Sequence, residues 1–177
     1  QLQDWQFDKL LRFYTQAQVL VNKEPKFLRK SNFPKVKTEI YFDIESDPTR
    51  GIDYLLGILI NPSAGSGQGK QEYKYILAKD KDDEGRMWNE FLDFLDGLDD
   101  FAIYHYAYYE KEVFRRLANK YGVSVELEQK FMELSVDLHL AVMNSVILPL
   151  YFYGLKDIAK YLGFKWTSQD AGGAESV

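Results

Sequence analysis

The sequence predicts an α/β domain with a mixed central sheet, because its strand and helix patterns follow one another in a characteristic order. Three stretches with strand character come first, at residues 38–45, 52–60 and 72–78. Helix and strand patterns then alternate through residues 85–163. This order is typical of a mixed sheet flanked by helices. The chain has 177 residues, 46% of them hydrophobic, and is long enough to bury one such core.

The N-terminal segment predicts an amphipathic helix followed by an extended connector. Apolar residues recur at near-helical spacing through residues 5–21, among them Phe7, Leu10 and Val21. Residues 22–37 contain two prolines and a cluster of lysines, which favour an extended chain. We therefore expect a helix and connector at residues 1–36 and a domain at residues 37–177.

The first predicted strand has the chemically most informative pattern. From Thr38, apolar residues at even positions alternate with a second face that carries Asp43 and Glu45. The turn sequence DPTRG and the apolar run at 52–60 predict a hairpin with a central second strand. Residues 72–78 then complete an antiparallel meander of three strands.

The remaining elements follow from periodicity and from their end signals. Residues 85–98 and 109–122 have helical spacing, and Gly97 and Gly122 are natural terminators. Residues 101–106 read as a short strand. Residues 136–143 fit a strand or the start of a helix, and residues 154–163 fit a helix.

Composition narrows the possible classes of protein. No segment approaches the roughly 18 apolar residues of a membrane span, and the amino end lacks signal-peptide features. The absence of cysteine excludes disulfides and thiolate zinc sites. A net charge of −5 gives no basic footprint for nucleic acid, although a carboxylate-bound metal would reverse the local field. We expect a cytoplasmic protein with no membrane partner.

The D-x-E pair of Asp43 and Glu45 has two interpretations. In the first, both acids lie on the solvated face of an edge strand. In the second, they are buried, where the two charges repel and each carboxylate is costly to desolvate unless a cation joins them. A hard divalent cation with oxygen ligands resolves this conflict, so we expect further carboxylates from elsewhere in the chain.

Two motifs carry a family resemblance. YFDIES resembles the first motif of the DEDD, or DnaQ-like, exonuclease superfamily, in which D-x-E lies on the first strand of a ribonuclease H-like sheet. HYAYYEKEVFRRL resembles the second motif, H-N-A-x-F-D, where His105 and Ala107 match and Tyr109 takes the aromatic place. Glu110 takes the place of the metal-site acid and is one methylene longer than the usual Asp. Tyr106 stands where Asn is usual.

These motifs are preceded by QAQVL and followed by YGLKDIAKYLGFKW. This order of segments is similar to that of the ribonuclease H-like domain of predicted RecB-family nucleases. The resemblance implies a ribonuclease H-like fold and a further nuclease domain in a longer chain. The superfamily has a fourth acid in a Y-x-x-x-D or H-x-x-x-D motif. Neither Asp170 nor Glu175 lies in such a motif, so we expect the last ligand to be missing from residues 37–177 and the fragment to lack activity for that reason.

The resemblance also implies a mechanism and a substrate. Two Mg²⁺ or Mn²⁺ ions would be bridged by Asp43, with Glu45 at the ion that activates water and Glu110 at the other. The expected activity is hydrolysis of phosphodiester bonds in DNA or RNA, as a 3′-5′ exonuclease. Two alternatives remain: a catalytically silent nucleic-acid-binding or scaffold domain, and an endonuclease of the ribonuclease H type.

Neighbouring polar residues have more ordinary interpretations. His105 is expected to be a core histidine at the end of a short strand, and Asp137 a capping or outer-shell acid. Of the tyrosines between 104 and 109, alternation places some in the core and some at the surface. The GSGQGK stretch lacks the spacing of a phosphate loop and is expected to be a flexible turn.

Overall fold

The computed structural model describes residues 3–62 and 70–165. The expected GSGQGK turn, Asp170 and Glu175 lie outside these residues. The described chain forms two compact units, one of residues 33–138 and one that joins residues 3–32 to residues 139–165. The predicted boundary between residues 36 and 37 stays a prediction, because compact packing alone does not show which segments fold independently.

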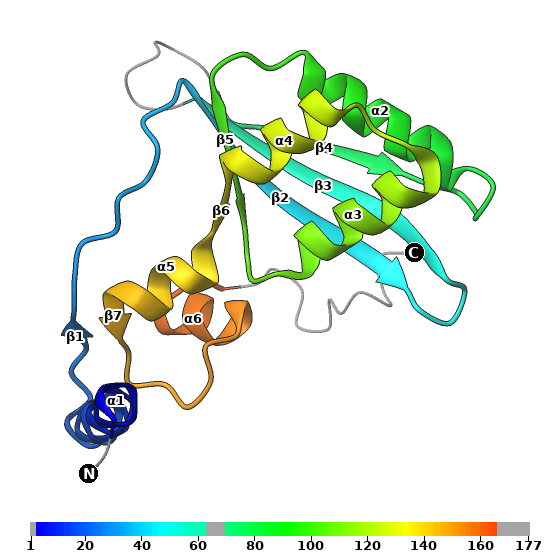
Figure 1. The fold of residues 1–177 in the computed structure, drawn as a ribbon. Coiled ribbons are helices and arrows are strands. Elements are labelled where there is room, and N and C mark those ends of the chain that lie inside the picture. Colours follow the sequence, from blue (N-terminus) through cyan, green and yellow to red (C-terminus); the bar gives the residue numbers. More distant parts are fainter. Residues whose placement is uncertain (1–2, 63–69, 166–177) are drawn as a thin grey trace. The chain divides into compact units, whose positions relative to one another are not determined.

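The larger unit contains a five-stranded mixed sheet, as predicted (Figure 1). Its strand order is β4-β3-β2-β5-β6. Strands β2, β3 and β4 form an antiparallel meander, and β5 and β6 run parallel to β2. The strands are β2 (Thr38–Asp47), β3 (Ile52–Pro62), β4 (Glu72–Leu77), β5 (Phe101–His105) and β6 (Ser135–Asp137).

Helices α2 (Glu84–Asp96), α3 (Tyr109–Tyr121) and α4 (Val125–Leu134) bury one face of this sheet. Phe42 of β2 stacks on Phe91 of α2, with ring centroids 4.7 Å apart, and its ring also meets an edge of the α4 aromatic Phe131. The core residues of β2 are therefore those at the even positions, as the period of two predicts.

The ends of these helices follow from local chemistry. Gly122 ends α3 with a φ of 87°, a conformation that glycine adopts without strain. The apolar pattern alone does not predict α4. The signal for it is Ser124, whose hydroxyl accepts a hydrogen bond from the backbone N–H of Leu127 at 3.1 Å and so caps the helix.

The smaller unit consists of α1 (Asp4–Asn22), β1 (Lys26–Phe27), most of α5 (Leu138–Ser145), β7 (Val146–Ile147) and α6 (Leu155–Tyr161). Strand β1 pairs antiparallel with β7. The Gln16 side chain of α1 donates hydrogen bonds to the backbone oxygens of Leu148 and Leu150, at 2.9 and 3.1 Å. These contacts join segments that are more than a hundred residues apart in the chain.

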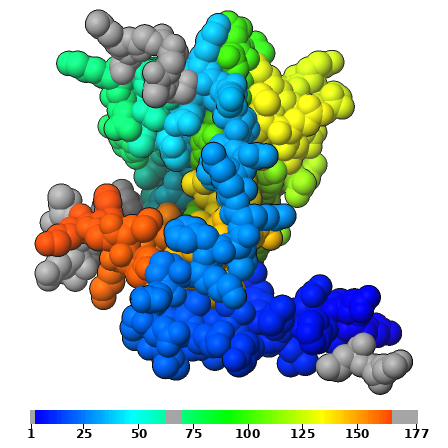
Figure 2. All heavy atoms as spheres, turned by 90° about the vertical axis from the view of Figure 1, so that its left-hand side faces the viewer, coloured from blue at the N-terminus to red at the C-terminus, as the bar shows by residue number. Residues whose placement is uncertain are grey.

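The predicted N-terminal helix is confirmed as α1, but the apolar residues that predicted it do not form its buried side. Phe7, Leu10 and Val21 are exposed, and the buried residues are Thr15 and Val19. Much of the surface of α1, in dark blue, is open in the space-filling view (Figure 2). Within residues 3–62 and 70–165, no helix combines the length and apolar character needed to cross a membrane.

Candidate functional site

The strand β2 presents Asp43 and Glu45 on the sheet face opposite Phe42. Asp43 pairs with Gly57 of β3, and a register shift follows Glu45. Asp43 is exposed and Glu45 is half-buried, so the expectation that both acids are buried is wrong for Asp43. The reason is that α2, α3 and α4 pack on the other face of the sheet.

Glu110 reaches the site from a different element, the first turn of α3. Its side chain points inward and the residue is only 5% exposed. A carboxylate in this position is favoured by the partial positive charge of the helix N-terminus. Glu110 is therefore the most deeply buried of the three predicted site acids.

Residues 106–108 set the entry into α3. Ala107 has a φ of 69°, an uncommon conformation for a residue with a Cβ. Its backbone N–H donates to Asp137 Oδ1 at 3.1 Å, and its carbonyl oxygen lies 2.6 Å from His105 Nδ1. Since a carbonyl oxygen only accepts, His105 Nδ1 carries the proton. Asp137 thus fixes the turn that precedes α3 rather than capping the helix, whose N-cap is Tyr108. His105 holds the same turn before Glu110.

Two buried polar atoms at this position have no hydrogen-bond partner among the described residues. They are Glu110 Oε2 and His105 Nε2. Glu110 Oε2 lies 3.6 Å from His105 Nδ1, which already bonds Ala107. A buried polar atom without a partner costs about 1–3 kcal/mol, so folding stability alone does not explain this arrangement. A buried atom of this kind is explained by strain, by a catalytic role or by a bound water or ion.

The charges of the three acids act on one another. Although Asp43 is exposed as a residue, the protein atoms around its carboxylate partly desolvate it, which raises its pKa above its usual range, and the charges of Glu45 and Glu110 raise it further. A hydrogen bond from the backbone N–H of Ile44, 3.0 Å from Asp43 Oδ1, opposes this shift. Glu110 therefore lies near enough to Asp43 for electrostatic coupling, although the two come from separate elements.

The chemistry of these donors fits a hard divalent cation, which prefers carboxylate oxygens. Within residues 3–62 and 70–165, however, no three or more His, Asp or Glu side chains are grouped so that they could hold a metal ion. Mg²⁺ commonly keeps several waters and uses only one or two carboxylates together with substrate phosphates. Asp43, Glu45 and Glu110 fit that mode of binding better than a closed protein cage.

A second group of buried acids lies beside the first and is fully paired. Glu84 Oε2 accepts hydrogen bonds from Lys120 and from the Tyr121 hydroxyl, the latter at 2.6 Å. Glu84 Oε1 accepts from the backbone N–H of Asp53 at 2.7 Å. The Asp53 carboxylate binds Arg116, whose Nη2 lies 2.5 Å from Oδ1. These bonds join the β2–β3 hairpin to α2 and α3.

This paired network touches both acid-bearing segments. Ser46, which follows Glu45, donates to the Asp53 carboxylate. Tyr109, which precedes Glu110, donates to the Ser46 hydroxyl at 2.5 Å. A pocket of about 330 Å³ lies over these residues. The network was missed at the level of sequence, and an acid at position 53 inside an apolar strand is the one signal that could have found it.

Comparison with protein families gives one match. A family model described as the RNase_H superfamily matches residues 40–177, which include all three site acids. The mixed five-stranded sheet of β2 to β6 is consistent with this fold. Comparison with curated proteins and with solved structures gave no match. The family match supports a nuclease-like domain, and nucleases of this kind generally use divalent metals.

Proposed function

Because the chain belongs to the ribonuclease H superfamily, we propose that Asp43, Glu45 and Glu110 form a metal-dependent nuclease site. The observation that carries this proposal is the unpaired, buried Glu110 Oε2, whose carboxylate, together with Glu45, acts on the pKa of Asp43. An acid retained in a buried position without a donor is best explained by a cation.

The three acids have distinct tasks in this proposal. Asp43, Glu45 and Glu110 would hold two Mg²⁺ or Mn²⁺ ions, with Asp43 serving both, Glu45 one of them and Glu110 the other. Such ions, when bound, lower the pKa of an attacking water and stabilise the leaving oxygen of a phosphodiester. His105 fixes the turn before α3 through Ala107 and thereby orients Glu110 toward the site.

We further propose that the reaction is 3′-5′ exonucleolytic and that the domain belongs to a larger RecB-family nuclease. The D-x-E on β2 and the acid at the start of α3 support this, since both match the DEDD motifs in kind and order. Whether DNA or RNA is cleaved is an outcome of the experiment below. A silent scaffold domain is the second candidate, favoured by the lack of a three-ligand group among the described residues.

The test compares Asp43→Asn with Glu39→Gln. Glu39 is a matched control because it is a carboxylate on the same face of β2 and is hydrogen-bonded to Asn61 and Tyr41. Single-stranded and duplex DNA and RNA are incubated with Mn²⁺ and the full-length protein, after any other nuclease domain has been inactivated. We expect Asp43→Asn to lower cleavage by at least about 100-fold, because a metal ligand contributes several kcal/mol, and Glu39→Gln to retain activity.

Either of two results would contradict the nuclease proposal. One is equal cleavage by wild type and Asp43→Asn. The other is no cleavage of any substrate by the wild type while nucleic-acid binding persists in Asp43→Asn, which would establish the scaffold alternative.

A further inference from the structure

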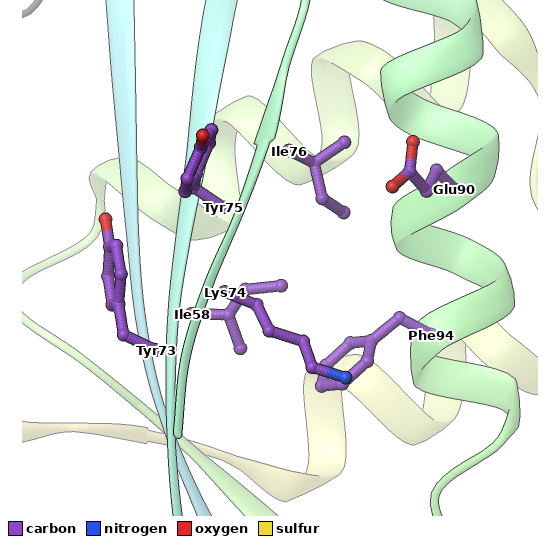
Figure 3. A pocket seen from close by; sticks show the side chains of 7 residues that line it. All are labelled: Ile58, Tyr73, Lys74, Tyr75, Ile76, Glu90 and Phe94. Carbon is purple, nitrogen blue, oxygen red and sulfur yellow. The ribbon is translucent and has the colours of Figure 1, made fainter. Parts of the chain in front are cut away.

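The sheet face that carries Asp43 has two exposed tyrosines at its edge. Tyr73 and Tyr75 belong to the edge strand β4 and are 62% and 64% exposed. Figure 3 shows both side chains on the side of β4 away from α2, whereas Ile76 points toward Glu90 and Phe94 of that helix. Both residues are also among those that line a pocket of about 380 Å³, but its other lining residues include Ile76, Glu90 and Phe94 on the α2 side of the strand.

The register of the sheet places these rings beside the acid. Tyr75 pairs with Gly57, and Gly57 pairs with Asp43, so the three residues form one row across three strands. Residues that pair directly across antiparallel strands point to the same side. Neighbouring strands lie about 4.8 Å apart, so Tyr75 and Asp43 originate only about 10 Å from each other.

Gly57 leaves the middle of this row open, and Tyr73 leans into it. A Cβ at position 57 would lie 3.2 Å from the Tyr73 hydroxyl and 3.8 Å from the backbone oxygen of Asp43. The rings of Tyr73 and Tyr75 have centroids 6.4 Å apart and are inclined by 31°. Together they form a continuous aromatic surface that ends at the strand of the acid.

We propose that Tyr73 and Tyr75 form a stacking platform that binds the bases of single-stranded nucleic acid next to Asp43. The proposal deepens the proposed function and rests on it, since it names the class of substrate. Aromatic rings stack on any base with a gain of about 1–3 kcal/mol per base. A duplex keeps its bases stacked within the helix, so only a single strand can use the platform.

Asp43 and Glu45 repel phosphates unless a cation is bound, so binding requires a divalent ion. A protein partner on this face has no such requirement.

The experiment measures fluorescence anisotropy of labelled oligonucleotides with the 177-residue chain. The probes are a single-stranded oligodeoxyadenylate, its duplex and an abasic strand of equal length, each with Ca²⁺ or with EDTA, and gels check that the probes stay intact. The variants are Tyr75→Leu, Tyr73→Leu and Tyr75→Phe. Tyr14→Leu is the control, because Tyr14 has the same 62% exposure but lies on α1 outside the sheet.

We expect Ca²⁺-dependent binding of the single strand, and a Kd about 5- to 100-fold higher for each Tyr→Leu variant, which is the stacking gain converted to affinity. Tyr75→Phe and Tyr14→Leu should bind like the wild type, and thermal melts should show all variants folded. Equal binding by wild type and the Tyr→Leu variants, or equal affinity for the abasic or duplex probe, overturns the platform, as does the absence of binding.

The two proposals fail separately. Cleavage that depends on Asp43 but not on the tyrosines would leave the nuclease site standing without its platform. Stacking that depends on the tyrosines, in a protein that cleaves nothing, would leave the platform standing without the nuclease.

Discussion

Glu110 and Glu84 are both buried glutamates at the start of a helix, yet their surroundings are opposite. Glu84 is 2% exposed and receives hydrogen bonds on both oxygens, from Lys120, Tyr121 and the backbone of Asp53. Glu110 is 5% exposed and has one oxygen with no partner among the described residues. The charge of Glu110 acts on the acid Asp43, and the ring nitrogen at 3.6 Å, His105 Nδ1, already bonds Ala107.

This difference separates an acid that stabilises the fold from an acid that we propose to bind metal. Burial acts to raise the pKa of Glu84, but the hydrogen bonds from Lys120, Tyr121 and Asp53 outweigh it and leave that pKa lowered. At Asp43, partial desolvation of the carboxylate and two like charges act together and leave the pKa raised. Both carboxylate oxygens of Glu84 have hydrogen-bond donors, so this fold can supply donors to a buried acid. The lack of a partner for Glu110 Oε2 among the described residues is a local feature of the proposed metal site.

The largest expected contrast is in stability, between Glu84→Gln and Glu110→Gln. Breaking a buried ion pair is costly, but Lys120 is partly exposed and can turn to water. We therefore expect Glu84→Gln to lower the free energy of unfolding by about 1–3 kcal/mol. Glu110→Gln should change it by less than about 1 kcal/mol or raise it, because a neutral amide is less costly to bury than a carboxylate.

Urea denaturation of the two variants and the wild type in EDTA measures this contrast. EDTA is needed because a bound cation would supply Glu110 with the partner that it lacks. A larger loss of stability for Glu110→Gln than for Glu84→Gln would show that Glu110 is the structural acid, contrary to the comparison.

A smaller effect is expected in the pH dependence of stability. The pKa of Asp43 is raised in the folded state, so its ionisation destabilises the fold as pH rises, and the penalty is absent below the unfolded pKa, near 4. Asp43→Asn should thus be more stable than wild type at neutral pH and equal to it in acid. The pKa of Glu84 is lowered, so its contribution is present above the unfolded pKa and is lost as pH falls.

The free energy of unfolding, measured in EDTA between about pH 3 and 7, tests the predicted direction of the pH dependence for both acids. The advantage of Asp43→Asn should grow with rising pH, while the deficit of Glu84→Gln should shrink with falling pH. If the stability of both variants relative to the wild type changed with pH in the same way, Asp43 and Glu84 would not differ in how their ionisation affects the fold.

The contrast between the two acids also shows how far sequence reasoning reaches. The faces of β2, the meander and the helix start at Glu110 follow from spacing alone, because strand and helix periods fix which residues share a side. The hydrogen bonds of Glu84 do not follow from spacing, since their donors lie 31 to 37 residues away in the chain and reach Glu84 only after folding.

Burial was the least predictable property. Asp43 was expected to be buried because apolar residues surround it in the sequence, but it belongs to the odd-numbered face of β2, on the side of the sheet away from α2, α3 and α4. The same limit applies to α1, whose apolar spacing is helical although residues such as Phe7 remain exposed. The sequence alone does not single out Tyr73 and Tyr75, because it is the strand register through Gly57 that places them beside Asp43.

The most direct test of the central claim is the effect of Mn²⁺ on the melting temperature. An ion that binds only the folded state stabilises it by RT ln(1 + [L]/Kd), about 1.4 kcal/mol at 10 mM for a weak site with a Kd of about 1 mM. Few protein ligands are available at Asp43, Glu45 and Glu110, so weak binding is expected. Melts of the wild type, Asp43→Asn, Glu110→Gln, Glu84→Gln and Glu39→Gln are compared with and without the ion.

We predict that Mn²⁺ raises the melting temperature of the wild type, Glu84→Gln and Glu39→Gln by the same amount, and that Asp43→Asn and Glu110→Gln lose most of this rise. Equal shifts in all five proteins, or no shift in the wild type, would contradict the assignment of Asp43 and Glu110 to a metal site.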